Sequence, residues 1–220
     1  MVIPRRFRGP RRSGNGGYTC GLVASCLDGP VEVTLRVPPP LDTPLKVEGE
    51  DGRVVVREGE TVVAEASPAT VELDAPEVSW PEAEAATARY TGFDEHEFPE
   101  CFVCGPAREP GDGLRIFPGA VRDGVVAAPW IAGDVSPEVV WAAIDCPGAY
   151  AAGYPNRGTV VLGRMAARID RLPDEGERCV SVGWSLGSDG RKLYAGTALL
   201  GADGRPCAVA RQVWIEPKRT

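Results

Sequence analysis

The sequence predicts an α+β protein in which one broad antiparallel sheet is wrapped around two central helices. Apolar residues recur at helical spacing in two places, after Gly14 and after Ser136. Each of these segments is followed by stretches in which apolar and polar residues alternate, as in half-buried strands. Asp-Gly pairs, which are typical of hairpin turns, separate several of the stretches. A helix followed by an antiparallel meander buries its apolar stripe against one sheet face, so two such units give one sheet with two helices.

The first predicted half covers residues 1–75. A helix is expected from Gly14 to Asp28, with Leu22 and Val23 on its apolar face, and Gly29-Pro30 ends it. Strands are then expected over residues 31–37, 45–48, 54–57 and 61–66. An acidic, Pro- and Ala-rich linker with a short helical piece is expected over residues 76–100.

The second predicted half covers residues 101–220. Its helix begins with Ser136 as N-cap and Pro137 in the first turn, and Pro147-Gly148 should kink or interrupt it. Strands are expected over residues 114–117, 124–130, 159–171, 179–186, 192–200 and 207–215.

The order of elements repeats between the halves. The turn Gly49–Arg53 corresponds to Gly187–Arg191, because both read Gly-x-Asp-Gly-Arg and both follow a helix and two strands. A repeat of this length indicates a tandem fold. The first half lacks counterparts to the strands expected before Ser136, so it is the degenerate copy.

Composition narrows the function classes. The 43% hydrophobic and 25% charged residues are typical of a packed globular protein. No apolar run approaches the roughly 20 residues that a membrane-spanning helix needs, and the N-terminal arginines precede no apolar signal segment. We therefore expect a cytoplasmic protein with reduced cysteines. The net charge of −7 argues against nucleic acid as the main partner.

One basic cluster stands out near the N-terminus. It consists of Arg5, Arg6, Arg8, Arg11 and Arg12. Runs of charge are usually solvated surface, but guanidinium groups also bind phosphates with two parallel hydrogen bonds. The cluster is therefore either a solvated arm or a binding site for the phosphates of a nucleotide-containing ligand.

Three stretches carry a resemblance to a known superfamily. They are Asn15-Gly16-Gly17, the segment from Trp141 through Asp145 to Tyr150, and Cys101-Phe-Val-Cys104-Gly105 with the later Gly113-Leu114-Arg115. With the helix-and-meander repeat, they resemble the acyl-CoA thioesterases of the hot-dog fold, of the phenylacetate-pathway and 4-hydroxybenzoyl-CoA types, in the double hot-dog form. The likeness covers most of residues 14–73 and 101–216, in short motifs.

The resemblance implies one composite site between the halves. In these families, a glycine amide and an acidic residue eight positions later come from opposite subunits. Here Ala24 stands eight positions after Gly16, and Pro137 stands eight positions before Asp145. The first helix thus keeps the glycines and the second keeps the acid. We therefore expect Gly16 or Gly17 to face Asp145, and the equivalent site with Ala24 and Pro137 to be inactive.

The expected chemistry is thioester hydrolysis. Free N–H groups of Gly16 and Gly17 at a helix start would stabilise the oxyanion, and Asp145 would act as general base or nucleophile. The predicted substrate-binding residues are Asn15, Tyr18, Trp141, Arg157, Arg11 and Arg12. The arginines would hold the phosphates of coenzyme A, which is part of the substrate; no other cofactor is expected, and a homodimer is compatible with the fold.

Other interpretations stay open. The glycines could form only a tight loop, and Asp145 could be a structural hydrogen-bonding group. The protein could equally bind acyl-CoA or another apolar molecule without catalysis. A dehydratase is disfavoured because its chemistry generally uses a histidine, and His96 is the one histidine of the chain. We expect no metal: Cys101, Cys104 and His96 offer three ligands, whereas structural zinc usually takes four.

Overall fold

The computed structural model describes residues 1–133 and 135–217. Within them the α-helices are α1 (Gly16–Ala24), α2 (Trp80–Thr87), α3 (Pro137–Ala143) and α4 (Cys146–Ala151), with 3-10 turns η1 (Arg5–Phe7) and η2 (Thr91–Phe93). The strands are β1 (Val31–Leu35), β2 (Lys46–Glu50), β3 (Arg53–Glu58), β4 (Thr61–Pro68), β5 (Gly119–Arg122), β6 (Val125–Ile131), β7 (Val161–Ile169), β8 (Arg178–Asp189), β9 (Lys192–Leu200) and β10 (Pro206–Ile215).

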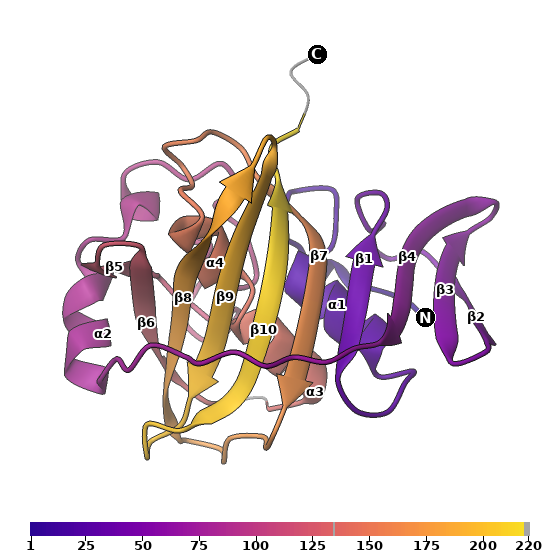
Figure 1. Ribbon diagram of the computed structural model, residues 1–220. Coiled ribbons are helices and arrows are strands. Elements are labelled where there is room, and N and C mark those ends of the chain that lie inside the picture. Colours follow the sequence, from indigo (N-terminus) through magenta and orange to yellow (C-terminus); the bar gives the residue numbers. More distant parts are fainter. Residues whose placement is uncertain (134, 218–220) are drawn as a thin grey trace.

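The described strands form one antiparallel sheet in the order β2-β3-β4-β1-β7-β10-β9-β8-β6-β5 (Figure 1). Counted outward from the centre of the sheet, the strands follow the order β1, β4, β3, β2 in the first half and β7, β10, β9, β8 in the second. The two orders correspond strand by strand. At the centre β1 pairs with β7, from Val31 opposite Ala167 to Thr34 opposite Arg164. The two halves therefore share a single backbone ladder, and β6 and β5 extend the sheet of the second half only.

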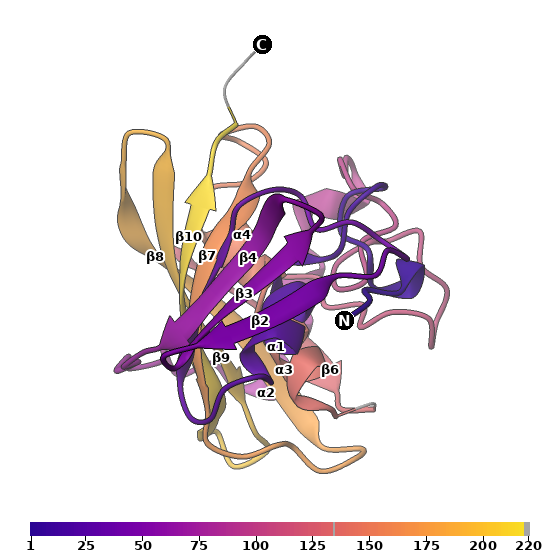
Figure 2. The ribbon, with the colours of Figure 1, turned by 90° about the vertical axis from the view of Figure 1, so that its right-hand side faces the viewer.

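Helices α1, α3 and α4 lie on one face of the sheet, with α1 beside α3 (Figure 2). The two helices pack closely because α1 presents glycines to α3. A Cβ on Gly21 would stand 2.6 Å from Glu138 Cα, and one on Gly17 would stand 2.6 Å from Trp141 O. Large side chains such as Ile144, Met165 and Leu199 fill the space between helices and sheet. This layer forms the larger of the two apolar cores.

The opposite face of the sheet is covered by the segment between β4 and α2, which crosses β7 to β10 (Figure 1), and by α2 itself. Val71 and Val78 of this segment pack with Val182 and Val209 of the sheet in a second apolar cluster. The Glu82 carboxylate accepts a hydrogen bond from the Ser79 N–H (2.8 Å) and thereby caps α2. Residues 80–87 of the expected linker thus form a helix that packs on the sheet.

Two local expectations need correction. Residues 114–117 form no strand, because Arg115 has a positive φ of 53° and the segment hydrogen-bonds to the turn at Phe102 instead of pairing with a strand. Ser136 is the N-cap of α3, as expected, but its side chain makes no capping hydrogen bond. The break expected at Pro147-Gly148 is confirmed, since α3 ends before it and α4 begins there. None of the described helices is long and apolar enough to span a membrane.

Candidate active site

Asp145 lies in the break between α3 and α4. Pro147 has no N–H, so it cannot donate to the Ala143 carbonyl four residues earlier, as a continuous helix would require. The Ser181 hydroxyl of β8 donates to that carbonyl at 2.6 Å. Gln212 Nε2 of β10 donates to the next carbonyl, that of Ile144, at 2.7 Å. The buried side chains of Ser181 and Gln212 thus donate hydrogen bonds to two helix carbonyl groups at the break and hold Asp145 in place.

Asn15 connects α1 to this break. It is the N-cap residue of α1, and its Oδ1 accepts a hydrogen bond from the Tyr18 N–H at 2.9 Å. Its Nδ2 donates to Asp145 Oδ2 at 2.7 Å. Because Oδ1 is used by the cap, the amide can present only its NH₂ group to the carboxylate. The start of α1, from the first half, and the acid of the second half therefore meet directly.

The two glycines have different positions. A Cβ on Gly17 would stand 2.5 Å from Asp145 Cβ, so only glycine permits the observed approach of α1 to the acid. Gly16 lines the cavity described below, where a Cβ would stand 2.9 Å from Leu162 Cβ. As a first-turn residue, Gly16 has an N–H with no acceptor inside the helix. It is the backbone donor best placed to serve a ligand.

The Asp145 side chain is almost fully buried, at 2% exposure. Burial raises its pKa to about 7; the Gly17 N–H and the Asn15 amide lower the pKa, and nearby Cys101 raises it. Its Oδ1 atom is buried and accepts no well-formed hydrogen bond from the described residues. A buried oxygen without a partner is costly, and a ligand or water at this position would relieve that cost.

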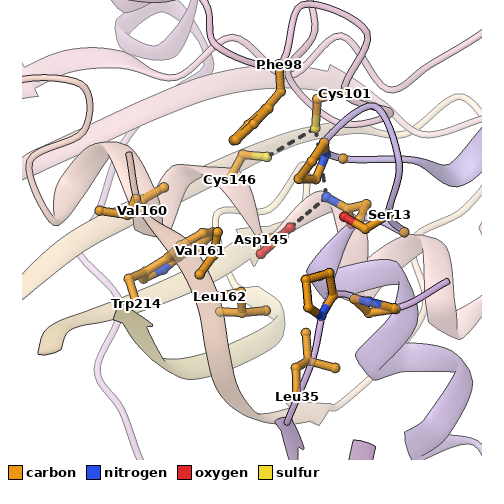
Figure 3. Close-up of a pocket in the computed structure, with 18 of the residues that line it drawn as sticks. Ser13, Leu35, Phe98, Cys101, Asp145, Cys146, Val160, Val161, Leu162 and Trp214 are labelled. Carbon is orange, nitrogen blue, oxygen red and sulfur yellow. Dashed lines mark hydrogen bonds between the residues drawn. The ribbon is translucent and has the colours of Figure 1, made fainter. Parts of the chain in front are cut away.

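A cavity of about 610 Å³ opens beside Asp145 (Figure 3). Leu162 and Trp214 form part of its wall, and most of the remaining wall is apolar. The polar residues of the wall include Asp145, Asn15 and His96. A mainly apolar cavity with a few converging polar groups is the usual form of a small-molecule site.

The structure brings some of the predicted site residues together and not others. Asn15, Gly16, Arg12 and Asp145 line the cavity, and Gly17 contacts Asp145 from behind it. Other predicted binding residues do not line the cavity. Tyr18 stacks on Phe7 with ring centroids 3.8 Å apart, and Trp141 is buried at the contact between α1 and α3. Tyr18 and Trp141 were predicted to bind substrate, whereas the structure packs both side chains in the apolar core.

The basic residues divide in the same way. Arg5, Arg6 and Arg8 pair with Asp42, Asp112 and Glu100, so these three belong to surface ion pairs. Arg157 pairs with Glu216 at 2.9 Å and lies outside the cavity wall, as does Arg11, which is exposed. Arg12 remains as the cavity-lining member of the predicted set.

Several cavity residues were not predicted as site residues. Cys101, Cys104 and Cys146 gather beside Asp145, with His96 next to Cys104. Tyr150 donates its hydroxyl hydrogen to the Tyr90 hydroxyl at 2.8 Å, and Tyr90 donates to the Cys104 carbonyl. The Cys-x-x-Cys spacing was visible in the sequence. The approach of Cys146 depends on the fold, so no local pattern showed it.

Comparisons with known proteins agree on the fold. No protein-family model and no curated protein sequence matches the chain. Among solved structures, the tesB protein of Mycobacterium avium subsp. paratuberculosis is similar, with 14% identity and a TM-score of 0.64 over 99% of this chain and 91% of that one. An acyl-CoA thioesterase II of Mycobacterium marinum gives 13% identity and a TM-score of 0.60 over 100% and 92% of the two chains.

A protein of unknown function with a hot-dog fold, from Alicyclobacillus acidocaldarius, gives 11% identity and a TM-score of 0.61, over 99% of this chain and 92% of that one. At these identities the likeness establishes the fold alone. The similarity extends over both halves and nearly the full length of each structure. The chain therefore has the double hot-dog fold that these thioesterase structures share.

Proposed function

We propose that this protein hydrolyses acyl-CoA thioesters at the composite site between its two halves. One observation carries the proposal: the Asp145 carboxylate and the open amide end of α1 meet at the wall of an apolar cavity. Thioester hydrolysis needs a donor for the developing oxyanion and a base for water, and these two groups supply them. The double hot-dog fold shared with acyl-CoA thioesterase II supports the same activity.

In the proposed reaction, Asp145 takes a proton from a water molecule whose oxygen attacks the thioester carbonyl carbon. The carbonyl oxygen becomes an oxyanion and is stabilised by the Gly16 N–H at the start of α1. Collapse of the intermediate breaks the C–S bond, the leaving thiolate of coenzyme A takes up the proton held by Asp145, and the fatty or aromatic acid leaves while Asp145 returns to its carboxylate form. Asn15 positions the carboxylate through its 2.7 Å hydrogen bond.

The shape of the cavity supports an acyl substrate. Its apolar wall, which includes Val160, Leu162 and Trp214, would take the acyl chain. Arg12 and Arg36 also line the cavity and are exposed. Arg36 is paired with Glu65, so the Arg12 guanidinium is the better placed of the two to reach phosphates outside the cavity. We assign Arg12 to the phosphates of coenzyme A.

A second candidate function is binding of an acyl thioester without hydrolysis. The close pairing of Asp145 with Asn15 and its 2% exposure favour this alternative, because one carboxylate oxygen is held by Asn15 and the whole side chain is buried away from water. Both functions use the same cavity, and turnover distinguishes them.

The test is release of free thiol from a panel of aliphatic and aromatic acyl-CoA thioesters. The wild-type protein should hydrolyse members of the panel, and Asp145→Asn should lower kcat by about 10²- to 10⁴-fold, the usual contribution of a general base. Asp203→Asn, in an exposed turn, is the matched control and should keep wild-type turnover. Wild-type turnover by Asp145→Asn would refute the assignment; calorimetric binding without hydrolysis by the wild type would favour the second function.

A further inference from the structure

Three buried thiols meet at the cavity wall beside Asp145. Cys101 and Cys104 come from the loop after η2, and Cys146 comes from the start of α4. The three sulfur atoms all lie within 4.8 Å of one another, and the thiols are free. The Cys101 and Cys146 sulfurs are 3.8 Å apart (Figure 3). All three residues line the cavity.

This spacing fits tetrahedral coordination by sulfur. Zinc–thiolate bonds of about 2.3 Å at tetrahedral angles place neighbouring sulfurs about 3.8 Å apart. The separation of Cys101 and Cys146 has this value. Soft thiolate ligands favour Zn²⁺ over Mg²⁺ or Ca²⁺, which take oxygen ligands.

Hydrogen-bond donors surround the thiols as they surround metal-bound thiolates. The Cys101 sulfur has an amide donor in its surroundings, the side chain of Asn15. Asn15 Nδ2 lies 3.9 Å from the same sulfur atom. The tight turn from Cys101 to Gly105 requires glycine at its end, where a Cβ would stand 2.5 Å from the Cys101 nitrogen. A loop built to bury only small apolar thiols needs no such donors.

His96 lies beside the three cysteines but is not one of the candidate metal ligands. Its Nδ1 accepts a hydrogen bond from the Phe98 N–H at 2.9 Å, so in the neutral ring Nε2 carries the proton. Nε2 lies 3.4 Å from Cys104 Sγ and donates to it. His96 is therefore a donor to a thiolate, and a fourth metal ligand has to come from the cavity.

We propose that Cys101, Cys104 and Cys146 bind one Zn²⁺ ion, with His96 donating a hydrogen bond to Cys104 and a water or ligand atom from the cavity in the fourth position. Three protein ligands with one open position are typical of zinc sites that face a ligand. The ion would join the loop of residues 96–105 to the start of α4, immediately after Asp145. The ligand set differs from the groups assigned to thioester hydrolysis, so the proposal does not depend on that function.

The experiment is metal analysis of untagged protein, purified without chelator and then incubated with Zn²⁺ and a non-thiol reductant before desalting. Inductively coupled plasma mass spectrometry should find about one zinc per chain, held against competition by a chromophoric chelator. Cys101→Ser, Cys104→Ser and Cys146→Ser should each reduce the ratio to about one tenth or less. The matched control is Cys26→Ser, which alters an exposed thiol and should keep full occupancy.

Two further variants sharpen the result. His96→Ala should keep the zinc but weaken its affinity by about 10- to 100-fold, as expected for a residue that contacts a ligand and not the metal. Asp145→Asn should keep zinc even where it abolishes hydrolysis, so the two proposals fail separately. Circular dichroism of each cysteine variant establishes that it is folded.

Substoichiometric zinc in the reconstituted wild type, below about one tenth of a mole per chain, would overturn the proposal whatever the variants do. An intact mass lower by two hydrogens in unreduced protein, a Cys101–Cys146 cross-link found by peptide mapping, and no zinc bound after reduction would show instead that these two cysteines form a disulfide. Full occupancy in all three cysteine variants would also refute the assigned ligands.

Discussion

Replacing Gly17 by alanine tests the contact on which the composite site depends. The added methyl carbon would stand 2.5 Å from Asp145 Cβ and 2.6 Å from Trp141 O, whereas carbon atoms pack at about 3.5–4.0 Å. One of these neighbours is a backbone oxygen, so rotation of a side chain cannot relieve the clash. Helix α1 and the Asp145 segment must instead separate by about 1 Å.

The cost in stability follows from this displacement. Overpacking a close contact costs about 1–3 kcal/mol, and replacing a helical glycine by alanine regains about 0.5–1 kcal/mol. The net loss of about 1–2 kcal/mol lowers Tm by about 2–8 °C in a chain of this length. Misplacing a catalytic donor by about 1 Å also lowers kcat by about 10²-fold.

The assay compares Gly17→Ala with Gly21→Ala by thermal unfolding and by acyl-CoA hydrolysis. A Cβ at Gly21 also meets α3, 2.6 Å from Glu138 Cα, but unlike a Cβ at Gly17 it would not meet Asp145. Both variants should lose similar stability, and only Gly17→Ala should lose most of its turnover. A wild-type Tm for Gly17→Ala, or equal loss of turnover in both variants, would refute the reasoning.

Three further predictions concern the stability of the protein and the size of the substrate that the cavity accepts. Gln212→Leu leaves the Ile144 carbonyl without its buried donor and should cost about 1–3 kcal/mol of unfolding free energy, measured by urea denaturation. Glu177 accepts hydrogen bonds from Arg171, which lower its pKa from the usual 4.5 to about 2. Glu177→Gln should therefore destabilise the protein by about 1 kcal/mol at pH 7, an effect that fades as the pH falls from 4.5 through 2. Val161→Trp places a larger side chain at a partly exposed cavity residue and should raise KM for long acyl chains more than for short ones.

Each of these predictions has a contrary outcome. Unchanged unfolding of Gln212→Leu would show that another group satisfies the Ile144 carbonyl. An effect of Glu177→Gln that keeps its full size at pH 2 would mean that charge is not its cause, since most of the charge-linked stability is lost once the pH has fallen from 4.5 to the folded pKa of about 2. Equal changes in KM for all chain lengths in Val161→Trp would place the acyl chain elsewhere.

Much of the fold could be predicted from local patterns. The apolar stretches and the Asp-Gly turns between them correctly located β8 to β10, which are buried on both faces of the sheet. Pro147 correctly marked the break in the second helix for a purely local reason, its missing N–H. Residues 114–117 were wrongly predicted as a strand, because their apolar character reflects burial and not pairing.

The site was only partly accessible to the same reasoning. The pairing of the α1 start with Asp145 came from motif resemblance, and the structure shows the two groups hydrogen-bonded through Asn15. The positions of Tyr18 and Trp141 depend on which way each helix faces its neighbour, and that is set by glycine contacts between helices. The meeting of Cys146 with Cys101 depends on tertiary structure and leaves no mark on local sequence.

The ladder between β1 and β7 limits how a ligand can reach the cavity. A pocket between two lobes can open by hinge bending. Here the lobes are the two halves of the chain, and four residue pairs between β1 and β7 join them at the middle of one continuous sheet. Swinging the lobes apart would break that ladder. Passage to Asp145 must instead run past the irregular segments of the cavity lining around Pro10 and Pro38, called the rim segments here, whose rearrangement leaves the sheet intact. Any slow step in loading or release should therefore respond to changes in these rim segments and not to changes in the sheet.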